Sequence, residues 1–262
     1  MPEYAFDNVW VHARQRLRGL EQLLDPGTIR HLEALGVAEG WHCLEIGAGG
    51  GSITEWLCRR VGHNGYVMAT DLNTRLLEAL AAPNLAVRRH DIMSDDYPES
   101  EFDLVLSRLV LGHVREREKA LRRMLAVLKP GGWLVCEDAD NVSVALLSPR
   151  DAANSALFLK VEQAKDKAMA ARGYEYCGRH LYGWLSAAGL TEVHAEGRVP
   201  LLYARTEPAQ WKRLSVEQLA GDIVRAQLAT DSEVAAYLAL LDSPNFAAQG
   251  FTVMTAWGRR PD

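Results

Sequence analysis

The stretch "LEIGAGGG", residues 44–51, decides the fold class, because four glycines in five positions directly follow an apolar run. Glycine has no Cβ, so such a loop can turn sharply at positive φ and lie close to a ligand. The apolar run predicts a buried strand, and residues 52–61 have the hydrophobic spacing of a helix. This edge of an α/β sheet is suited to a dinucleotide pyrophosphate or to a sulfonium amino acid.

The alternation of strands and helices continues on the C-terminal side of the loop. Short apolar runs alternate with amphipathic helical patterns as far as residue 138, which predicts a parallel α/β sheet with helices on both faces. Beyond residue 138 the chain is richer in helices, and two further strands close the pattern. We expect strands at 42–46, 66–70, 85–90, 102–107, 133–138, 191–198 and 251–258.

Segments before the glycine loop and after the second strand predict further helices. Residues 8–24 have helical spacing, and Asp25-Pro26 is typical of the start of a second helix. A further helix is expected to begin at Asn73. We therefore expect a helical cap at 1–35, followed by a domain at 36–262 with helical lid insertions at 141–177 and 206–243.

Composition indicates an ordinary soluble globular protein. Of 262 residues, 48% are hydrophobic and 24% are charged, and the net charge of −5 argues against a dedicated nucleic-acid partner. The four cysteines form no CxxC motif, so neither a disulfide framework nor a zinc site is expected. We find no signal peptide and no apolar run long enough for a membrane span, and we expect a cytoplasmic protein without membrane association.

The glycine spacing favours one of the two ligand classes. A dinucleotide fold needs G-x-G-x-x-G, but Ser52 occupies the third glycine position, and the pattern E-x-G-x-G-x-G from Glu45 to Gly51 fits better. Asp71, at the end of the second strand, can accept both ribose hydroxyls. Asp91-Ile92, after the third strand, offers one acceptor and one apolar surface to an adenine.

At this point the chain resembles the class I S-adenosylmethionine-dependent methyltransferases. It is most similar to the small-molecule branch, which includes the quinone and bacterial natural-product methyltransferases. The resemblance implies a Rossmann-like seven-stranded sheet, mostly parallel with an antiparallel last strand. It is carried by "LEIGAGGG", "ATDL" (69–72), "RHDIM" (89–93), "FDLVLSRLVLGHV" (102–114) and "LKPGGWLVCED" (128–138).

The resemblance also implies the cofactor-binding residues. Glu45 and the glycine-loop backbone would hold the methionine end of S-adenosylmethionine, Asp71 the ribose, and Asp91 with Ile92 the adenine. S-adenosylhomocysteine would be the product. The complete expected set is Glu45, Gly47, Ala48, Gly49, Gly51, Asp71, Leu72, Asp91, Ile92 and Ser107.

Three residues are candidates for a general base, which methyl transfer needs only when the nucleophile keeps its proton. His113 follows the fourth strand, but it could equally cap the next helix. Asp138 ends the fifth strand, where a turn cap is the alternative role. His180 could reach the site from the lid, and ordinary packing is its alternative.

Acceptor binding is expected to involve aromatic side chains and one arginine. Arg108 could hold an anionic or carbonyl group, or could form a salt bridge at the sheet edge. Arg16 could meet the cofactor carboxylate or lie exposed on the surface. The aromatic candidates, each of which could instead be a core residue, are Tyr4, Phe6, Trp10, Tyr203 and Trp211.

The predicted function is methyl transfer to O, N or C of a small organic molecule, such as a secondary metabolite. An NAD(P)-dependent reductase and a non-catalytic protein of the methyltransferase fold are the alternatives. Catechol-type relatives need an acidic metal ligand after the fourth strand together with Asp-Asn after the fifth. Only Asp140-Asn141 is present, so we expect no metal. The sequence leaves the oligomeric state open, with a homodimer as one option.

Overall fold

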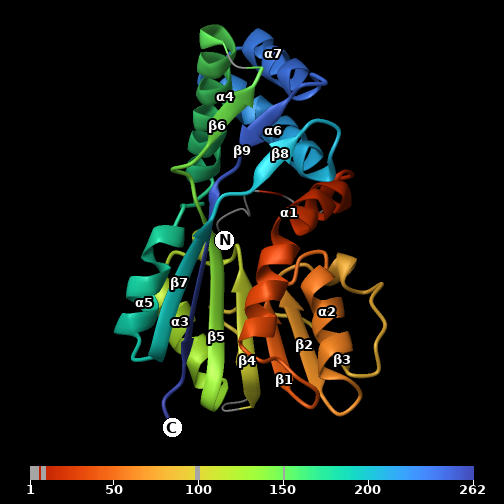
Figure 1. Cartoon of the computed structure of the whole chain (residues 1–262), viewed down its shortest axis with the longest axis vertical. Coiled ribbons are helices and arrows are strands. Elements are labelled where there is room, and N and C mark those ends of the chain that lie inside the picture. The colour runs from red at the N-terminus through yellow and green to blue at the C-terminus, as the bar shows by residue number, and fades with distance from the viewer. Residues whose placement is uncertain (1–5, 7–9, 98–100, 150) are drawn as a thin grey trace. The chain divides into compact units, whose positions relative to one another are not determined.

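A computed structural model describes residues 6, 10–97, 101–149 and 151–262 (Figure 1). The chain divides into two compact units. We call Leu24–Ala139, Cys177–Gly197 and Val253–Asp262 the sheet unit. The helical unit comprises Met1–Leu23, Asp140–Tyr176 and Arg198–Thr252.

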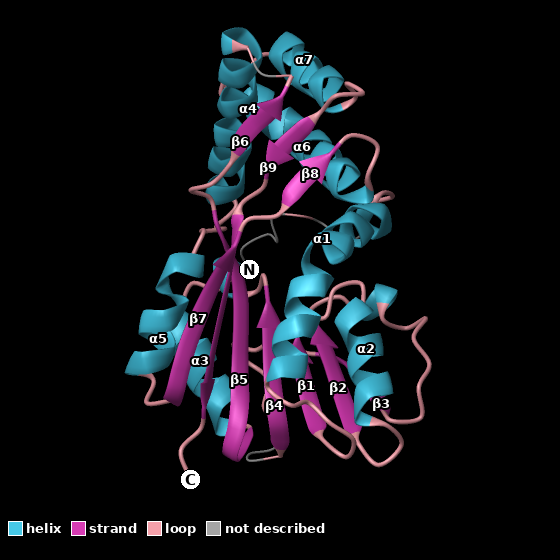
Figure 2. Cartoon of the chain, in the orientation of Figure 1, coloured by secondary structure: helices cyan, strands magenta, loops and turns pink. Residues whose placement is uncertain are grey.

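The sheet unit is built on a seven-stranded sheet in the order β3-β2-β1-β4-β5-β10-β7. β1 pairs in parallel with β2 and β4, and β4 pairs in parallel with β5. The last strand, β10, runs in the opposite direction and leads to the C-terminus (Figure 2), which confirms the predicted fold class. The strands are β1 (His42–Ile46), β2 (Tyr66–Asp71), β3 (Leu85–Arg89), β4 (Phe102–Arg108), β5 (Leu128–Asp140), β7 (Thr191–Arg198) and β10 (Thr252–Arg259).

Helices cover both faces of this sheet. Side chains alternate along a strand, so Leu104 and Leu106 of β4 face one side while Val105 faces the other. Leu104 and Leu106 pack in one core cluster with α2 (Ser52–Val61) and the C-terminal half of α1 (Ala13–Ala34). Val105 packs in a second cluster with α3 (Arg117–Ala126) and α5 (Leu181–Ala187).

The predicted break at Asp25-Pro26 is wrong, because α1 continues through it to Ala34. Pro26 lacks an amide hydrogen, so one helical hydrogen bond is missing there, but the helix persists. The carboxylate of Asp25 does not cap a new helix and instead pairs with Arg108. Sequence spacing could not show this partner, which lies 83 residues away along the chain.

The helix expected to begin at Asn73 is reduced to a 3-10 turn, η1 (Thr74–Leu76). Asp71 accepts the amide of Asn73, and the Asn73 side chain accepts the amide of Arg75. Such local side-chain bonds compete with an α-helical ladder. Two other 3-10 turns are η2 (Leu111–His113) and η3 (Gly178–His180).

The helical unit contains three long helices and a small antiparallel sheet that the sequence did not reveal. Phe158, Tyr237 and Phe246 form its aromatic core, with ring centroids 5.6 Å apart between Phe158 and Tyr237. The sheet has the order β6-β9-β8. The elements are α4 (Ala152–Ala171), α6 (Glu207–Arg225), α7 (Asp231–Leu241), β6 (Ala145–Ser148), β8 (Leu201–Tyr203) and β9 (Ala247–Gln249).

The unit boundaries differ in detail from the expected segments. The helical unit includes residues 206–243 and extends over Arg198–Thr252. Residues 24–35 belong to the sheet unit, so α1 is shared between the two units. Within the described ranges, no helix is both long and apolar enough to cross a membrane.

Candidate functional site

The glycine loop lies between β1 and α2, at the carboxyl edge of the parallel strands. The amides of Gly47 and Ala48 donate to the carbonyl of Thr70 at 2.8 and 3.0 Å, which holds the loop against the end of β2. Gly47 has φ +71°, and a Cβ there would lie 2.4 Å from Val110 Cγ2. Gly51 has φ +88° and provides no side-chain cap for α2. The loop backbone therefore requires glycine at both positions.

Asp71 joins the glycine loop to the end of β2. Its Oδ2 accepts the amide of Gly49 at 2.9 Å, and its Oδ1 accepts the amide of Asn73 at 2.9 Å. The side chain is half-buried, and burial raises its pKa. A carboxylate has about four lone-pair positions, so two such bonds leave acceptor capacity for ligand hydroxyls.

Glu45 lies buried beneath the same loop. Thr54 Oγ1 donates to its Oε2 at 2.5 Å, and only 2% of the residue is exposed. Burial raises the pKa of Glu45 to about 7, against the opposing effect of the Thr54 hydrogen bond. A carboxyl group that is this easily protonated would gain from a cation placed beside it.

The remaining expected cofactor residues follow the ends of β1 to β4. Ala48, Ile92 and Ser107 are buried, whereas 55% of Leu72 is exposed. Asp91 is half-buried, and its Oδ1 accepts the amide of Met93 at 2.9 Å. All of these residues belong to the sheet unit and follow or end neighbouring parallel strands. This is the edge at which open α/β sheets bind ligands.

Arg108 has an ion-pair partner within the sheet unit. Its Nη1 lies 2.7 Å from Asp25 Oδ1, and Ser52 Oγ donates to the same oxygen at 3.0 Å. Arg108 Nη1 also lies 3.3 Å from Thr28 Oγ1. This geometry supports the salt-bridge alternative for Arg108. No local pattern in the sequence indicated a site role for Asp25, Thr28 or Ser52.

Glu137 extends the network beneath the sheet edge. Its Oε1 accepts from Thr28 Oγ1 at 3.0 Å, and its Oε2 accepts from Thr255 Oγ1 at 2.9 Å. Glu137 and Asp138 are each 1% exposed. Neutral hydroxyl donors therefore satisfy a carboxylate that is cut off from solvent.

Asp138 holds the turn that carries His113. Its Oδ2 accepts the amide of Gly112 at 3.2 Å, and its Oδ1 accepts the amide of Ala139 at 3.0 Å. Burial raises the pKa of Asp138 to about 6. His113 is half-buried at the end of η2. These contacts support the turn-cap role for Asp138, and they place His113 on a braced turn that follows β4.

His180 does not belong to the predicted lid. It lies in η3 of the sheet unit, is exposed, and stacks against Trp184 with ring centroids 5.5 Å apart. The lid location is therefore wrong. The error arose because the chain leaves the helical unit at Tyr176, four residues before this histidine.

Four of the five aromatic candidates belong to the helical unit, and the fifth, Tyr4, lies outside the described residues. Trp211 is 9% exposed and packs edge-on against Phe251, which is the arrangement of a core residue. Trp10 is half-buried, and Tyr203 is 53% exposed. The guanidinium of Arg16 lies 4.4 Å from the ring centroid of the buried Phe6. Surface exposure of Arg16 was one expectation, and it is wrong because 2% of the residue is exposed.

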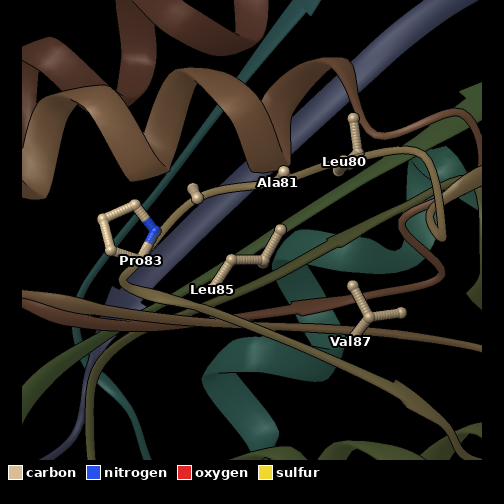
Figure 3. Close-up of a pocket in the computed structure, with 6 residues that line it drawn as sticks. Leu80, Ala81, Pro83, Leu85 and Val87 are labelled. Atoms are coloured by element: carbon tan, nitrogen blue, oxygen red, sulfur yellow. The ribbon is translucent and has the colours of Figure 1, made fainter.

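An apolar pocket of about 380 Å³ lies at the β3 edge of the sheet unit (Figure 3). None of the expected cofactor residues lines it. It nevertheless adjoins the glycine loop, because a Cβ at Gly51 would lie 2.4 Å from Leu80 Cδ1. Its lining residues are Leu80, Ala81, Ala82, Pro83, Leu85 and Val87.

Comparison with known proteins finds similarity to methyltransferases. Residues 44–136 match the family model described as "Methyltransferase domain". The ubiquinone/menaquinone biosynthesis C-methyltransferase UbiE of Azotobacter vinelandii is 36% identical over 137 residues, covering 49% of this chain and 53% of that protein. The chain thus spans about half the length of the curated relatives it matches.

Solved structures share the fold at lower identity. YcgJ of Bacillus subtilis superposes with a TM-score of 0.60 at 14% identity, over 91% of this chain and 99% of that chain. Phosphoethanolamine N-methyltransferase 2 of Haemonchus contortus, solved with phosphomonomethylethanolamine and S-adenosylhomocysteine, gives a TM-score of 0.55 at 18% identity. That match covers 95% of this chain and 52% of the other.

Proposed function

We propose that this chain, which carries a class I S-adenosylmethionine-dependent methyltransferase domain of the quinone-methyltransferase-like type, transfers a methyl group to a small organic molecule. The observation that supports this most directly is the junction of Asp71 with the glycine loop. The Asp71 carboxylate accepts the Gly49 amide of the loop and retains lone pairs that can accept hydrogen bonds from ligand hydroxyls. Reductase chemistry is disfavoured because Ser52 takes the third glycine position of the dinucleotide pattern.

The residues present fit S-adenosylmethionine. Asp71 would accept the ribose hydroxyls, Asp91 and Ile92 would receive the adenine, and the amides at the start of α2 would face the methionine carboxylate. The buried carboxyl group of Glu45 would lie beside the methionine ammonium and balance its positive charge. When bound, the cofactor supplies an electrophilic methyl group on a sulfonium. The contribution of the chain is positioning and exclusion of water.

For the acceptor, we propose a small organic molecule such as a secondary metabolite. The curated relative named above is a C-methyltransferase of ubiquinone/menaquinone biosynthesis. Carbon methylation of an electron-rich ring is therefore the first reaction to test, before O- or N-methylation. Tyr203 is the aromatic candidate to substitute first, because 53% of it is exposed. Tyr4, Phe6 and Trp10 remain proposed acceptor contacts. Trp211 and Arg108 rank below them, because Trp211 packs as a core residue and Arg108 pairs with Asp25.

His113 is the proposed general base, if the acceptor needs one. It is half-buried on a turn that Asp138 holds through the Gly112 amide. Asp138 would then act by positioning His113, and His180 ranks below both because its ring stacks on Trp184. His113→Ala should remove the acid limb of the pH–rate profile. An unchanged acid limb with near-full rate would exclude His113 from the mechanism.

The test of the proposed function is a calorimetric titration with S-adenosylhomocysteine and, separately, with NADH. We expect the first ligand to bind and the second to give no heat of binding. Binding of NADH alone would contradict the proposal. Transfer of a labelled methyl group to candidate phenols and quinols would then separate an enzyme from a non-catalytic binding protein.

A further inference from the structure

The segment that leads from β3 towards β4 carries Asp91 and Ile92, and two stacked rings hold its ends together. The ring centroids of His90 and Tyr97 are 3.6 Å apart, with 28° between the ring planes. His90 is 9% exposed and Tyr97 is half-buried. The stack therefore joins the two ends of the loop, and it is partly shielded from solvent.

The hydroxyl of Tyr97 connects this loop to the end of β2. It lies 3.1 Å from Thr70 Oγ1, and Thr70 Oγ1 in turn donates to the carbonyl of Glu45 at 3.1 Å. Since Thr70 uses its only hydroxyl proton on Glu45, Tyr97 is the donor in the first bond. Burial raises the pKa of Tyr97 to about 12, so this proton is present at neutral pH.

Thr70 is also the residue to which the glycine loop is attached. Its carbonyl accepts the amides of Gly47 and Ala48. On the other side of the stack, the amide of His90 donates to the carbonyl of Asp71 at 3.0 Å. The Tyr97 hydroxyl and the His90 amide thus bond to Thr70, which supports the glycine loop, and to Asp71, which carries the proposed ribose carboxylate.

The loop between the rings is internally bonded. The amide of Asp91 donates to Asp95 Oδ2 at 2.9 Å, and the amide of Met93 donates to Asp91 Oδ1 at 2.9 Å. Asp91 and Ile92 therefore move with the loop, which is joined to the end of β2 by the Tyr97 hydroxyl and by the His90 amide.

We propose that His90 and Tyr97 are positioning residues for the adenosine half of the cofactor. They align the Asp91-Ile92 loop with Asp71 and the glycine loop through Thr70, and they touch no reacting atom. The inference rests on the proposed function, because it assumes an adenosine-bearing ligand. A site held in its bound geometry before the ligand arrives loses less conformational freedom on binding.

The test compares two tyrosine variants of the full chain. Tyr97→Phe removes the hydroxyl that reaches Thr70 and keeps the ring. Tyr66→Phe makes the same change at the opposite end of β2, where the tyrosine ring packs edge-on against His42, and serves as the matched control. Dissociation constants are measured by calorimetry for S-adenosylhomocysteine and for 5′-methylthioadenosine, which lacks the amino-acid end.

We expect Tyr97→Phe to weaken both ligands by the same factor, about threefold to tenfold, as for one lost hydrogen bond. Tyr66→Phe should change neither by more than about twofold. Thr70→Val should weaken both ligands as well. The double variant Tyr97→Phe/Thr70→Val should be little weaker than the worse single variant, since both changes break one connection.

Two results would overturn the inference while leaving the proposed function intact. One is unchanged affinity of Tyr97→Phe for both ligands. The other is weaker binding of S-adenosylhomocysteine alone, which would mean that Tyr97 affects the amino-acid end of the ligand and not the adenosine. If the unmodified protein binds neither ligand, the proposed function fails, and the inference fails with it.

Discussion

The sheet unit and the helical unit both bury carboxylates, but they satisfy them differently. In the sheet unit, Glu45 and Asp138 accept hydrogen bonds from a hydroxyl and from backbone amides, and burial raises the pKa of both. In the helical unit, Glu162 is 2% exposed and contacts the ammonium groups of Lys165 and Lys212 at 2.8 Å each. Burial alone would raise the pKa of Glu162, but the two lysines hold it well below its usual range.

The difference separates a site from a structural core. Carboxyl groups with neutral partners still gain from a positive ligand, whereas Glu162 is already neutralised by its own unit. Tyr237 of α7 also donates to Glu162, and Lys212 Nζ lies 5.2 Å from the ring centroid of Phe158. The cluster therefore ties α4, α6 and α7 together and is expected to matter for stability, not for ligand binding.

The largest expected effect comes from breaking this cluster. Glu162→Gln leaves two buried ammonium groups facing a neutral amide, and we expect a loss of about 3–5 kcal/mol in the free energy of unfolding. Urea denaturation followed by circular dichroism measures it. Lys160→Gln on the same helix, which breaks an ion pair of a half-exposed lysine, should cost less than about 1 kcal/mol. Equal losses of unfolding free energy in the two variants would show that the buried cluster stabilises the unit no more than the half-exposed ion pair does.

The next effect concerns affinity in the sheet unit. Asp71→Ala should weaken S-adenosylhomocysteine by about 1–3 kcal/mol, because the ribose hydroxyls lose their acceptor. Asp103→Asn, at the opposite edge of the same sheet, where Asp103 pairs with Lys129 at 2.8 Å, is the control. Calorimetry should show a loss for Asp71→Ala only. Unchanged affinity of that variant would refute the ribose assignment.

The two units are expected to differ in the direction in which their buried carboxylates make folding stability depend on pH. The pKa of Glu45 in the folded state, about 7, exceeds its unfolded value of about 4.3, so the folded state retains the proton longer. Stability of the unliganded protein should therefore fall as pH rises through that window. Glu45→Gln should remove this loss and stabilise the protein at pH 8 by about 1–3 kcal/mol, with little gain at pH 4.5.

Glu162 should show the opposite dependence. Its folded-state pKa lies below its unfolded value, so its contribution is complete above about pH 4.3 and is lost as pH falls through the lower folded value. Urea midpoints of the two variants and the parent, measured across pH, give both signs. A Glu45→Gln variant no more stable than the parent at pH 8 would contradict the burial argument.

The smallest effect concerns the glycine loop itself. Gly51 and Gly36 both have positive φ, but a Cβ at Gly51 would lie 2.4 Å from Leu80 Cδ1, whereas nothing lies within 4 Å at Gly36. Gly51→Ala should therefore cost about 1 kcal/mol more than Gly36→Ala. Thermal unfolding of the two variants measures the difference, and equal melting temperatures would show that the contact does not matter.

Much of the sheet unit could be predicted from the sequence. Its strands are short apolar runs bounded by turn residues, and the cofactor motifs follow those strands directly along the chain. Such features are local, so Glu45, Asp71 and Asp91 could be placed before any coordinates. The same reasoning failed at Asp25, where local spacing predicted a cap and a residue 83 positions away took the carboxylate.

The sequence by itself therefore determined the α/β class, the glycine loop and the order of the motifs, because each depends on periodicity and on glycine within a few residues. Only the tertiary structure decided the partners of Arg108, the stacking of His90 on Tyr97 and the buried Glu162 cluster. These contacts join residues far apart in the chain or on different elements. Their energies depend on burial and distance, which no local pattern specifies.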